Sequence, residues 1–234
     1  MARLARLAVA GHVHLLIQRG HNGQAVFVDS ADRQSYLRLL RGAAAANQVA
    51  IHAYALTDCE VYLLATPGEA EGLSRMMQSL GRGYGADFNR RHGRSGTLWE
   101  GRFRATVIEA EPFLQACICH VELAPLRAGL VSVAQDHPWS SARHHLGLAR
   151  DPLVTDHPLY WATGNTPFER EAAHRRLLER ALTSRQTAEI EYAATRAWVL
   201  GSDGFKAALE ELTGRRVTPG RRGRPRKLPV LKPE

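Results

Sequence analysis

The sequence predicts an α+β protein with a ferredoxin-like antiparallel four-stranded sheet and helices packed on one face of that sheet. Three observations support this prediction. Four short apolar runs of β type occur before residue 110, helical periodicity separates the first run from the second and the third from the fourth, and a further helical stripe follows the last run. The resulting order is strand, helix, strand, strand, helix, strand, helix.

The four strands are recognised by short apolar runs bounded by turn residues. The first run ends at a loop rich in glycine, histidine and asparagine, and the second and third flank a predicted hairpin turn at 57–59. The predicted strands are 12–18, 51–56, 60–65 and 103–108.

Three helices follow from apolar residues that recur at spacings of three and four. Ser30 or Asp32 is expected to cap the first, which contains Tyr36 and Leu40 on its apolar stripe. The second extends along the apolar stripe of 73–88. The third is expected to begin at Pro112, because proline suits the first turn of a helix.

The remaining chain predicts two further segments. Helices are expected over 167–182, 187–200 and 203–212. From Gly214 onward there are three glycines, four prolines and no helical periodicity, so this stretch is expected to be disordered. The predicted organisation is a main domain at 1–147, a small helical extension at 148–213 and a disordered basic tail at 214–234.

Composition is that of a globular protein, with 44% hydrophobic and 23% charged residues in 234. The three cysteines form an odd, sparse set, which indicates a reducing compartment. No stretch approaches the roughly 18 apolar residues of a membrane span. We therefore expect a cytoplasmic protein without membrane association, attached to the nucleoid if it binds DNA.

The positive charge is concentrated in two places. The formal net charge is +8, and residues 214–234 hold eight basic residues against one acid. A second basic stretch, 75–104, has seven arginines against Asp87 and Glu100. Clustered arginine is typical of proteins that bind polyanions, because neutralised phosphates release condensed counterions. The alternative is a solvated tail that only keeps the protein soluble.

Two short motifs suggest binding chemistry. Residues 222–227, Arg-Gly-Arg-Pro-Arg-Lys, resemble an AT-hook, whose thin backbone and flanking arginines suit narrow A·T-rich minor grooves. His12 and His14 are spaced to share one face of a strand, as a histidine metal pair would require. Because no third ligand lies near them in the sequence, we interpret this pair as structural.

Several longer segments together resemble one family. The most specific is 88–104, Phe-Asn-Arg-Arg-His-Gly-Arg-Ser-Gly-Thr-Leu-Trp-Glu-Gly-Arg-Phe-Arg. The others, in chain order, are 11–14, 18–22, 51–56, 63–67, 125–131 and 137–141. Over residues 1 to about 147 the chain resembles the single-tyrosine HUH transposases, specifically the REP-associated tyrosine transposases of the insertion-sequence-200-like group.

This resemblance implies a reaction and a partner. Such enzymes transfer strands of single-stranded DNA, usually at the foot of a hairpin, and often act as homodimers. Two histidines on a central strand and a polar side chain from a helix hold a divalent metal, Mg or Mn, and a tyrosine on that helix attacks the phosphate.

The chain departs from the family pattern at each reacting position. Glu60 and Tyr62 stand where the resemblance places the two metal histidines, and His120 stands at the nucleophile position. Ala124 replaces the helical asparagine, and Cys59 replaces an asparagine before the first histidine. We therefore predict a DNA-binding protein of the transposase family, with a role in DNA transposition, without a metal cofactor and without strand cleavage.

Other readings of these replacements remain open. Glu60, Tyr62 and His120 could form a rewired strand-transferase or nuclease site, or Glu60 and His120 could hold zinc with a cysteine. They could also be a repacked pocket, and the chain a scaffold for a protein partner.

The predicted DNA contacts are basic. Trp99 or Phe103 is expected either to stack on a base or to pack in the core. The predicted DNA-binding residues are Arg19, Arg90, Arg91, Arg94, Arg102, Arg104, Arg222, Arg224, Arg226 and Lys227.

Overall fold

A four-stranded antiparallel sheet forms the centre of the protein, whose computed structural model describes residues 6–219. The strand order is β2-β3-β1-β4, and each neighbouring pair is antiparallel. The predicted fold class is confirmed. The strands are β1 (Val13–Arg19), β2 (Val49–Leu56), β3 (Glu60–Pro67) and β4 (Arg104–Ile108).

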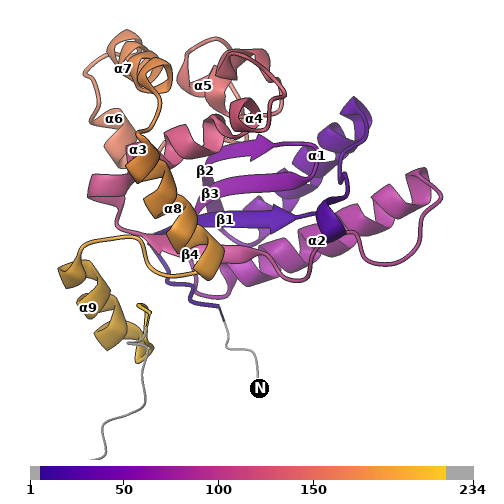
Figure 1. Ribbon diagram of the computed structural model, residues 1–234, viewed down its shortest axis with the longest axis horizontal. Helices are drawn as coiled ribbons and strands as arrows, with labels where there is room; N and C mark the ends of the chain where they lie inside the picture. The colour runs from indigo at the N-terminus through magenta and orange to yellow at the C-terminus, as the bar shows by residue number, and fades with distance from the viewer. Residues whose placement is uncertain (1–5, 220–234) are drawn as a thin grey trace, which may run out of the picture.

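Two long helices, α1 (Ser30–Ala46) and α2 (Gly72–Arg91), cover one face of the sheet (Figure 1). Leu16 and Leu63 of the sheet are buried in one cluster with Tyr36 of α1 and Leu80 of α2. These are the two crossover helices of the ferredoxin-like arrangement, and they lie on one face as predicted.

The residue that caps α1 is Asp29, so the prediction of Ser30 or Asp32 was wrong by a few positions. The Asp29 Oδ1 atom accepts a hydrogen bond from the Asp32 backbone N–H at 2.8 Å. The Asp32 carboxylate in turn accepts the backbone N–H of Asp29, which completes a capping box. Asp32 is therefore the third residue of the helix rather than its cap.

The second face of the sheet is also apolar, and it is covered by α3 (Ala110–Glu122) and α8 (Ser184–Arg196) (Figure 1). Leu15 and Leu64 pack there with Ile118 of α3 and Ile190 of α8. The sequence of β1 agrees with this arrangement, because a strand that is buried on both faces has consecutive apolar residues instead of alternating apolar and polar ones. Helices therefore lie on both faces once α3 and the extension are included.

The predicted helical extension is present, and it shares the core of the second face. The helix expected at 187–200 begins three residues earlier, because Thr183 caps it, and ends before Ala197, which adopts a left-handed conformation. The remaining helices are α4 (Ala124–Arg127), α5 (Ala142–His145), α6 (Pro158–Trp161), α7 (Pro167–Arg180) and α9 (Asp203–Thr213), with 3-10 turns at His21–Gly23 and Ala134–Asp136.

The segment after α9 packs against the domain for a few residues. Val217 is buried in a small cluster with Val9 and Val199, and the Val199 N–H donates to the Val217 carbonyl at 3.3 Å. Val217, which belongs to the predicted tail of 214–234, thus packs against the domain. The AT-hook-like residues Arg222, Arg224, Arg226 and Lys227 lie outside the described residues. Within 6–219, no helix combines the length and apolarity needed to cross a membrane.

Two buried tyrosines of the α1–α2 core provide a matched test of this packing. The Tyr84 hydroxyl donates to the Val26 carbonyl at 2.5 Å, whereas the buried Tyr36 hydroxyl has no partner among the described residues. We expect Tyr84→Phe to lower the free energy of unfolding by about 1–2 kcal/mol and Tyr36→Phe to leave it unchanged or raise it. Urea unfolding of both variants measures this, and equal losses would contradict the assigned hydrogen bonding.

Candidate nucleic-acid interface

Glu60 lies at the start of β3, where both of its carboxylate oxygens are engaged. Arg19, opposite it on β1, places Nε 2.5 Å from Glu60 Oε1. Tyr62 is two residues further along β3 and therefore on the same face, and its hydroxyl donates to Glu60 Oε2. The carboxylate is thus paired with a guanidinium and accepts a hydrogen bond from a phenol.

His120, which belongs to α3, lies next to Tyr62 of β3. Its ring lies 6.2 Å from the Tyr62 ring, centroid to centroid, at an interplanar angle of 72°. The structure therefore brings together Glu60, Tyr62 and His120, as the resemblance predicted. Ala124, the fourth position, is buried at the start of α4 and offers only a methyl group.

The His120 imidazole is neutral. Its side chain is buried, with 1% of the residue exposed, and burial together with the nearby Arg127 charge lowers its pKa to about 3. Arg127 donates an N–H to His120 Nε2 at 3.3 Å, so the imidazole proton belongs on Nδ1. That Nδ1 is buried and has no partner among the described residues.

These residues do not fit a divalent metal. Glu60 is the only anion among them, and it is already paired with Arg19. The His120 Nε2 lone pair faces Arg127, so two guanidinium groups oppose the approach of a cation. A metal-polarised phosphate is therefore not supported at this site.

The cysteines do not complete a zinc site with Glu60 and His120. Cys59 is half-buried in the β2–β3 turn, next to Asp58, whose carboxylate pairs with the Arg33 guanidinium. Cys117 and Cys119 are buried, and burial raises the pKa of Cys119 to about 12. Among residues 6–219, the side-chain groups with metal-binding proximity are Glu122–His145–His174 and Asp29–Asp32–His92, and neither includes this site.

Tyr62 is a protonated phenol at neutral pH. Burial raises its pKa, and the hydrogen bond to Glu60 and the charge of that carboxylate raise it further. As a nucleophile it would depend on Glu60 to accept its proton. Arg19 and Arg127 lie nearby as the groups able to hold a phosphate.

An arginine-rich cleft of about 660 Å³ begins at Arg19. It lies between the ends of β1 and β4, the end of α8 and residues 215–217. Glu100 is the one acidic residue among the described residues that line it. The arginines that line this cleft, hereafter the arginine cleft, are Arg6, Arg19, Arg102, Arg104, Arg196, Arg215 and Arg216.

The helical extension builds one wall of the arginine cleft. Arg104 of β4 donates to the Thr195 carbonyl at the end of α8, at 2.9 Å. The Leu200 N–H donates to the Val107 carbonyl, also at 2.9 Å, and holds the chain after α8 against β4. Burial of the second sheet face thus positions Arg196 and Arg216, both exposed, opposite the sheet arginines.

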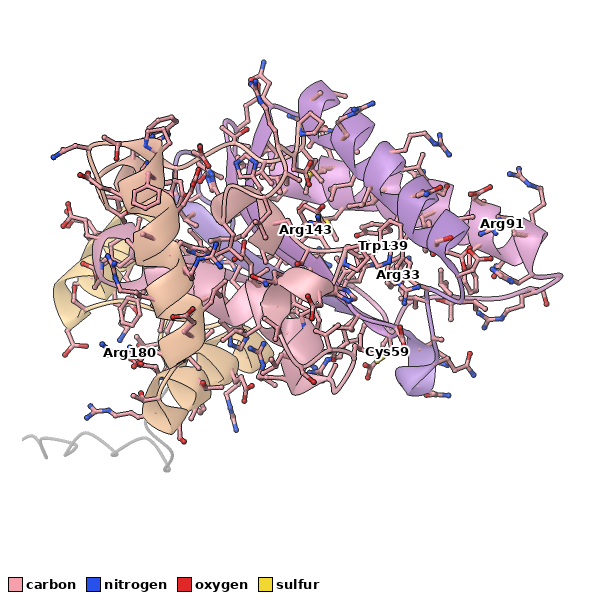
Figure 2. All side chains as sticks on the ribbon, turned by 90° about the horizontal axis from the view of Figure 1, so that it is seen from above. Arg33, Cys59, Arg91, Trp139, Arg143 and Arg180 are labelled. Atoms are coloured by element: carbon pink, nitrogen blue, oxygen red, sulfur yellow. The ribbon has the colours of Figure 1, made fainter. Side chains whose placement is uncertain are left out.

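The predicted DNA-binding arginines separate into two groups. Arg19, Arg102 and Arg104 line the arginine cleft. The second group consists of Arg90 and Arg91, at the end of α2, and Arg94, in the loop that follows. Figure 2 shows Arg91 at one end of the molecule. Arg90 pairs with Asp87, Arg91 with Asp29 and Asp32, and Arg94 donates to Gln24 Oε1 at 3.0 Å.

The two candidate stacking aromatics belong to the core. Trp99 is 7% exposed and packs near Tyr36 and Tyr84. Phe103 is 8% exposed, and the Arg6 guanidinium lies 3.8 Å from its ring centroid. Of the two expected roles, the structure supports core packing.

His14 is a structural histidine, as we interpreted it. Its Nδ1 lies 2.8 Å from the His12 carbonyl, and its Nε2 accepts the Val9 N–H at 3.2 Å. Burial lowers its pKa to about 4. Both ring nitrogens therefore serve the backbone at the entry to β1.

Five arginines of this region were missed by the sequence reasoning, namely Arg127 and the cleft residues Arg6, Arg196, Arg215 and Arg216. Arg127 lies in the 125–131 segment that the family resemblance includes, so that segment could have signalled it. Arg215 and Arg216 were counted only as part of the basic tail. Arg196 ends a helix without any basic neighbour, so nothing in the sequence indicated its place.

The comparisons with known proteins concern the fold. A solved structure of a REP-associated tyrosine transposase bound to a REP hairpin is similar, with a TM-score of 0.54 and 16% identity over 68% of this chain and 96% of that chain. A candidate transposase from Deinococcus radiodurans R1 has a TM-score of 0.37 and 17% identity, over 55% of this chain and 98% of that chain. No family model and no curated protein match the sequence.

The chain therefore has a transposase-like fold. Its particular likeness is to the REP-associated tyrosine transposase, and the resemblance drawn from the sequence motifs is confirmed at the level of the fold.

The buried neutral His120 predicts a pH dependence of stability. In the unfolded chain a histidine takes up a proton below about pH 6.5, whereas folded His120 resists protonation until about pH 3. Its stabilising contribution is therefore complete above pH 6.5 and is lost as the pH falls toward 3. We expect His120→Gln to reduce the fall in unfolding free energy between pH 6 and 5 by about 1 kcal/mol per pH unit. Urea unfolding at these pH values measures this, and parallel profiles would contradict a neutral His120.

Proposed function

We propose that the protein binds hairpin or single-stranded DNA through the arginine cleft and does not cleave it. The observation that supports this most is the charge of the cleft, which has seven arginines against one acid and includes Arg19, the ion-pair partner of Glu60. Such a surface suits a phosphate backbone, because each neutralised phosphate releases counterions. The family role to which this would relate is DNA transposition.

The absence of cleavage follows from the chemistry of the site. Glu60 and His120 are occupied by Arg19 and Arg127, so no residue there offers a free ligand pair for a metal. A guanidinium can bind a phosphate, but it provides no open coordination position that would activate the phosphorus. The two guanidinium groups would therefore bind the DNA without cleaving its phosphodiester backbone.

Further parts of the proposal concern the rest of the chain. The AT-hook-like residues at 222–227 would add affinity for A·T-rich duplex beside the hairpin. The protein would then be found in the cytoplasm at the nucleoid, as a monomer or homodimer. The division into 1–147, 148–213 and 214–234 stays a prediction.

A second candidate function rests on the Tyr62–Glu60 hydrogen bond. A phenol beside a carboxylate base and two arginines is an arrangement that could attack a phosphate without metal. This would make the protein a strand transferase with a relocated nucleophile. A third candidate, a scaffold for a protein partner, predicts no affinity for nucleic acid.

DNA binding is tested with a fluorescent hairpin carrying a single-stranded flank, titrated at rising salt. We expect the affinity to fall steeply with salt. The double variant Arg196→Ala/Arg216→Ala should bind more weakly, with a salt slope smaller by about 1.4, since two single-strand phosphate contacts are lost.

The matched control removes two exposed arginines of α7, Arg176→Ala/Arg180→Ala. Neither arginine lines the arginine cleft, and Figure 2 shows Arg180 toward the opposite end of the molecule from Arg91. The control should retain the wild-type affinity and slope. An affinity that does not change with salt, or an equal loss of affinity in both double variants, would contradict the arginine cleft as the DNA-binding site and favour the scaffold function.

Cleavage is tested by incubating the protein with the same hairpin, with and without Mn²⁺, followed by denaturing gels. We expect no nicked product and no covalent protein–DNA adduct, because no metal ligand set is present. An adduct that persists in His120→Ala but disappears in Tyr62→Phe would establish the relocated nucleophile instead.

A further inference from the structure

Glu122 lies on α3 two residues beyond His120 and faces away from it, into a separate buried cluster. The Glu122 side chain is fully buried. Its Oε1 lies 2.6 Å from His145 Nδ1 of α5, and its Oε2 lies 2.6 Å from His174 Nε2 of α7. Both histidines are buried as well, at 1% and 3% exposure. The cluster joins α3 to two helices that follow it by many residues.

We propose that Glu122, His145 and His174 form a binding site for a divalent transition-metal ion, with Zn²⁺ as the best match. One ligand atom from each residue lies within 4.8 Å of the other two. Two imidazole nitrogens and one carboxylate oxygen are a ligand set that zinc accepts readily. The ion would fasten α5 and α7 to α3.

The spacing of the ligand atoms suits an ion after a small adjustment. Ligands that surround zinc at about 2.0–2.1 Å in tetrahedral geometry are separated from each other by roughly 3.3 Å. Each Glu122–histidine contact is 2.6 Å, so each needs to open by less than about 1 Å.

The charge of the cluster also favours a cation. Glu122 brings an acidic side chain into the protein core, where it contacts His145, His174 and Ser141. A buried carboxylate needs compensation, and a divalent cation held by Glu122 and the two histidines would supply it.

The surroundings of the cluster position the ligands. Ser141 Oγ donates to Glu122 Oε1 at 2.6 Å and fixes the carboxylate. The second nitrogen of His145, Nε2, lies 3.8 Å from Asp156 Oδ1, and the Tyr160 ring packs 4.8 Å from the His145 ring. A histidine that binds metal with one nitrogen commonly has a carboxylate near the other. At 3.8 Å the Asp156 carboxylate acts on His145 through its charge rather than through a hydrogen bond, and its Oδ1 atom lies 3.2 Å from His144 Nε2.

The other cluster of acids and histidine, Asp29–Asp32–His92, does not share these properties. Arg91 pairs with both aspartates, and the same aspartates cap α1. That cluster is neutralised by a guanidinium and supplies a matched control.

The test uses the full chain, purified without a histidine tag, with metal content measured by mass spectrometry after exhaustive dialysis. We expect about one Zn²⁺ per chain, or one Zn²⁺ taken up on addition. A chelator should lower the thermal unfolding temperature, and Zn²⁺ should restore it. Co²⁺ substitution should give visible d–d bands of a nitrogen and oxygen ligand set.

Variants locate the site. His174→Gln should reduce the bound metal to a trace, whereas His92→Gln should retain it. Asp156→Asn leaves all three ligands in place and should weaken Zn²⁺ binding by about 10–100-fold, so it remains informative if His174→Gln does not fold. Wild-type protein that neither contains nor takes up Zn²⁺ or Co²⁺ would overturn the proposal. Metal retained in His174→Gln, or lost in His92→Gln, would do the same.

Discussion

The requirement to bury both faces of the central sheet determines how the rest of the protein is arranged. Leu15, Ile17 and Leu64 face away from α1 and α2, and they would be exposed without α3 and α8. At about 25 cal/mol per Å² of apolar surface, leaving a sheet face uncovered would cost more than a domain's usual net stability. The helical extension is therefore part of the core, and the arginine cleft exists because α8 ends beside β4.

The same packing places polar residues on two opposite sides of α3 near its C-terminal end. His120 and Glu122 are two residues apart, so they project from opposite sides of a helix whose apolar residues, such as Ile118, bury against the sheet. His120 meets Arg127 and Tyr62 at the sheet edge, whereas Glu122 meets the two histidines beneath α5 and α7. A shift of α3 along its axis would disturb both clusters together.

The elements were predictable because their periodicity is local. Short apolar runs placed every strand, and apolar residues at helical spacing placed every long helix, within a few positions. Errors arose where a single side chain determines the end of a helix, as Asp29 does for α1. The site was less predictable. Family motifs brought together Glu60, Tyr62 and His120, but Arg196 and Arg216 meet the sheet arginines only through tertiary packing. Glu122 is separated from its histidine partners by 23 and 52 residues, and no sequence motif includes Glu122 together with either histidine.

Under the proposed function, the residues around Glu60 and His120 would separate DNA binding from DNA cleavage. A divalent ion at a phosphate supplies both positive charge and an open coordination position, and only the second activates the phosphorus. Arg19 and Arg127 supply positive charge beside Glu60 and His120 but have no coordination position to offer. The proposed attraction for the DNA backbone would therefore come without stabilisation of the transition state for cleavage. Positive charge without Lewis acidity is what the proposed function requires of this site.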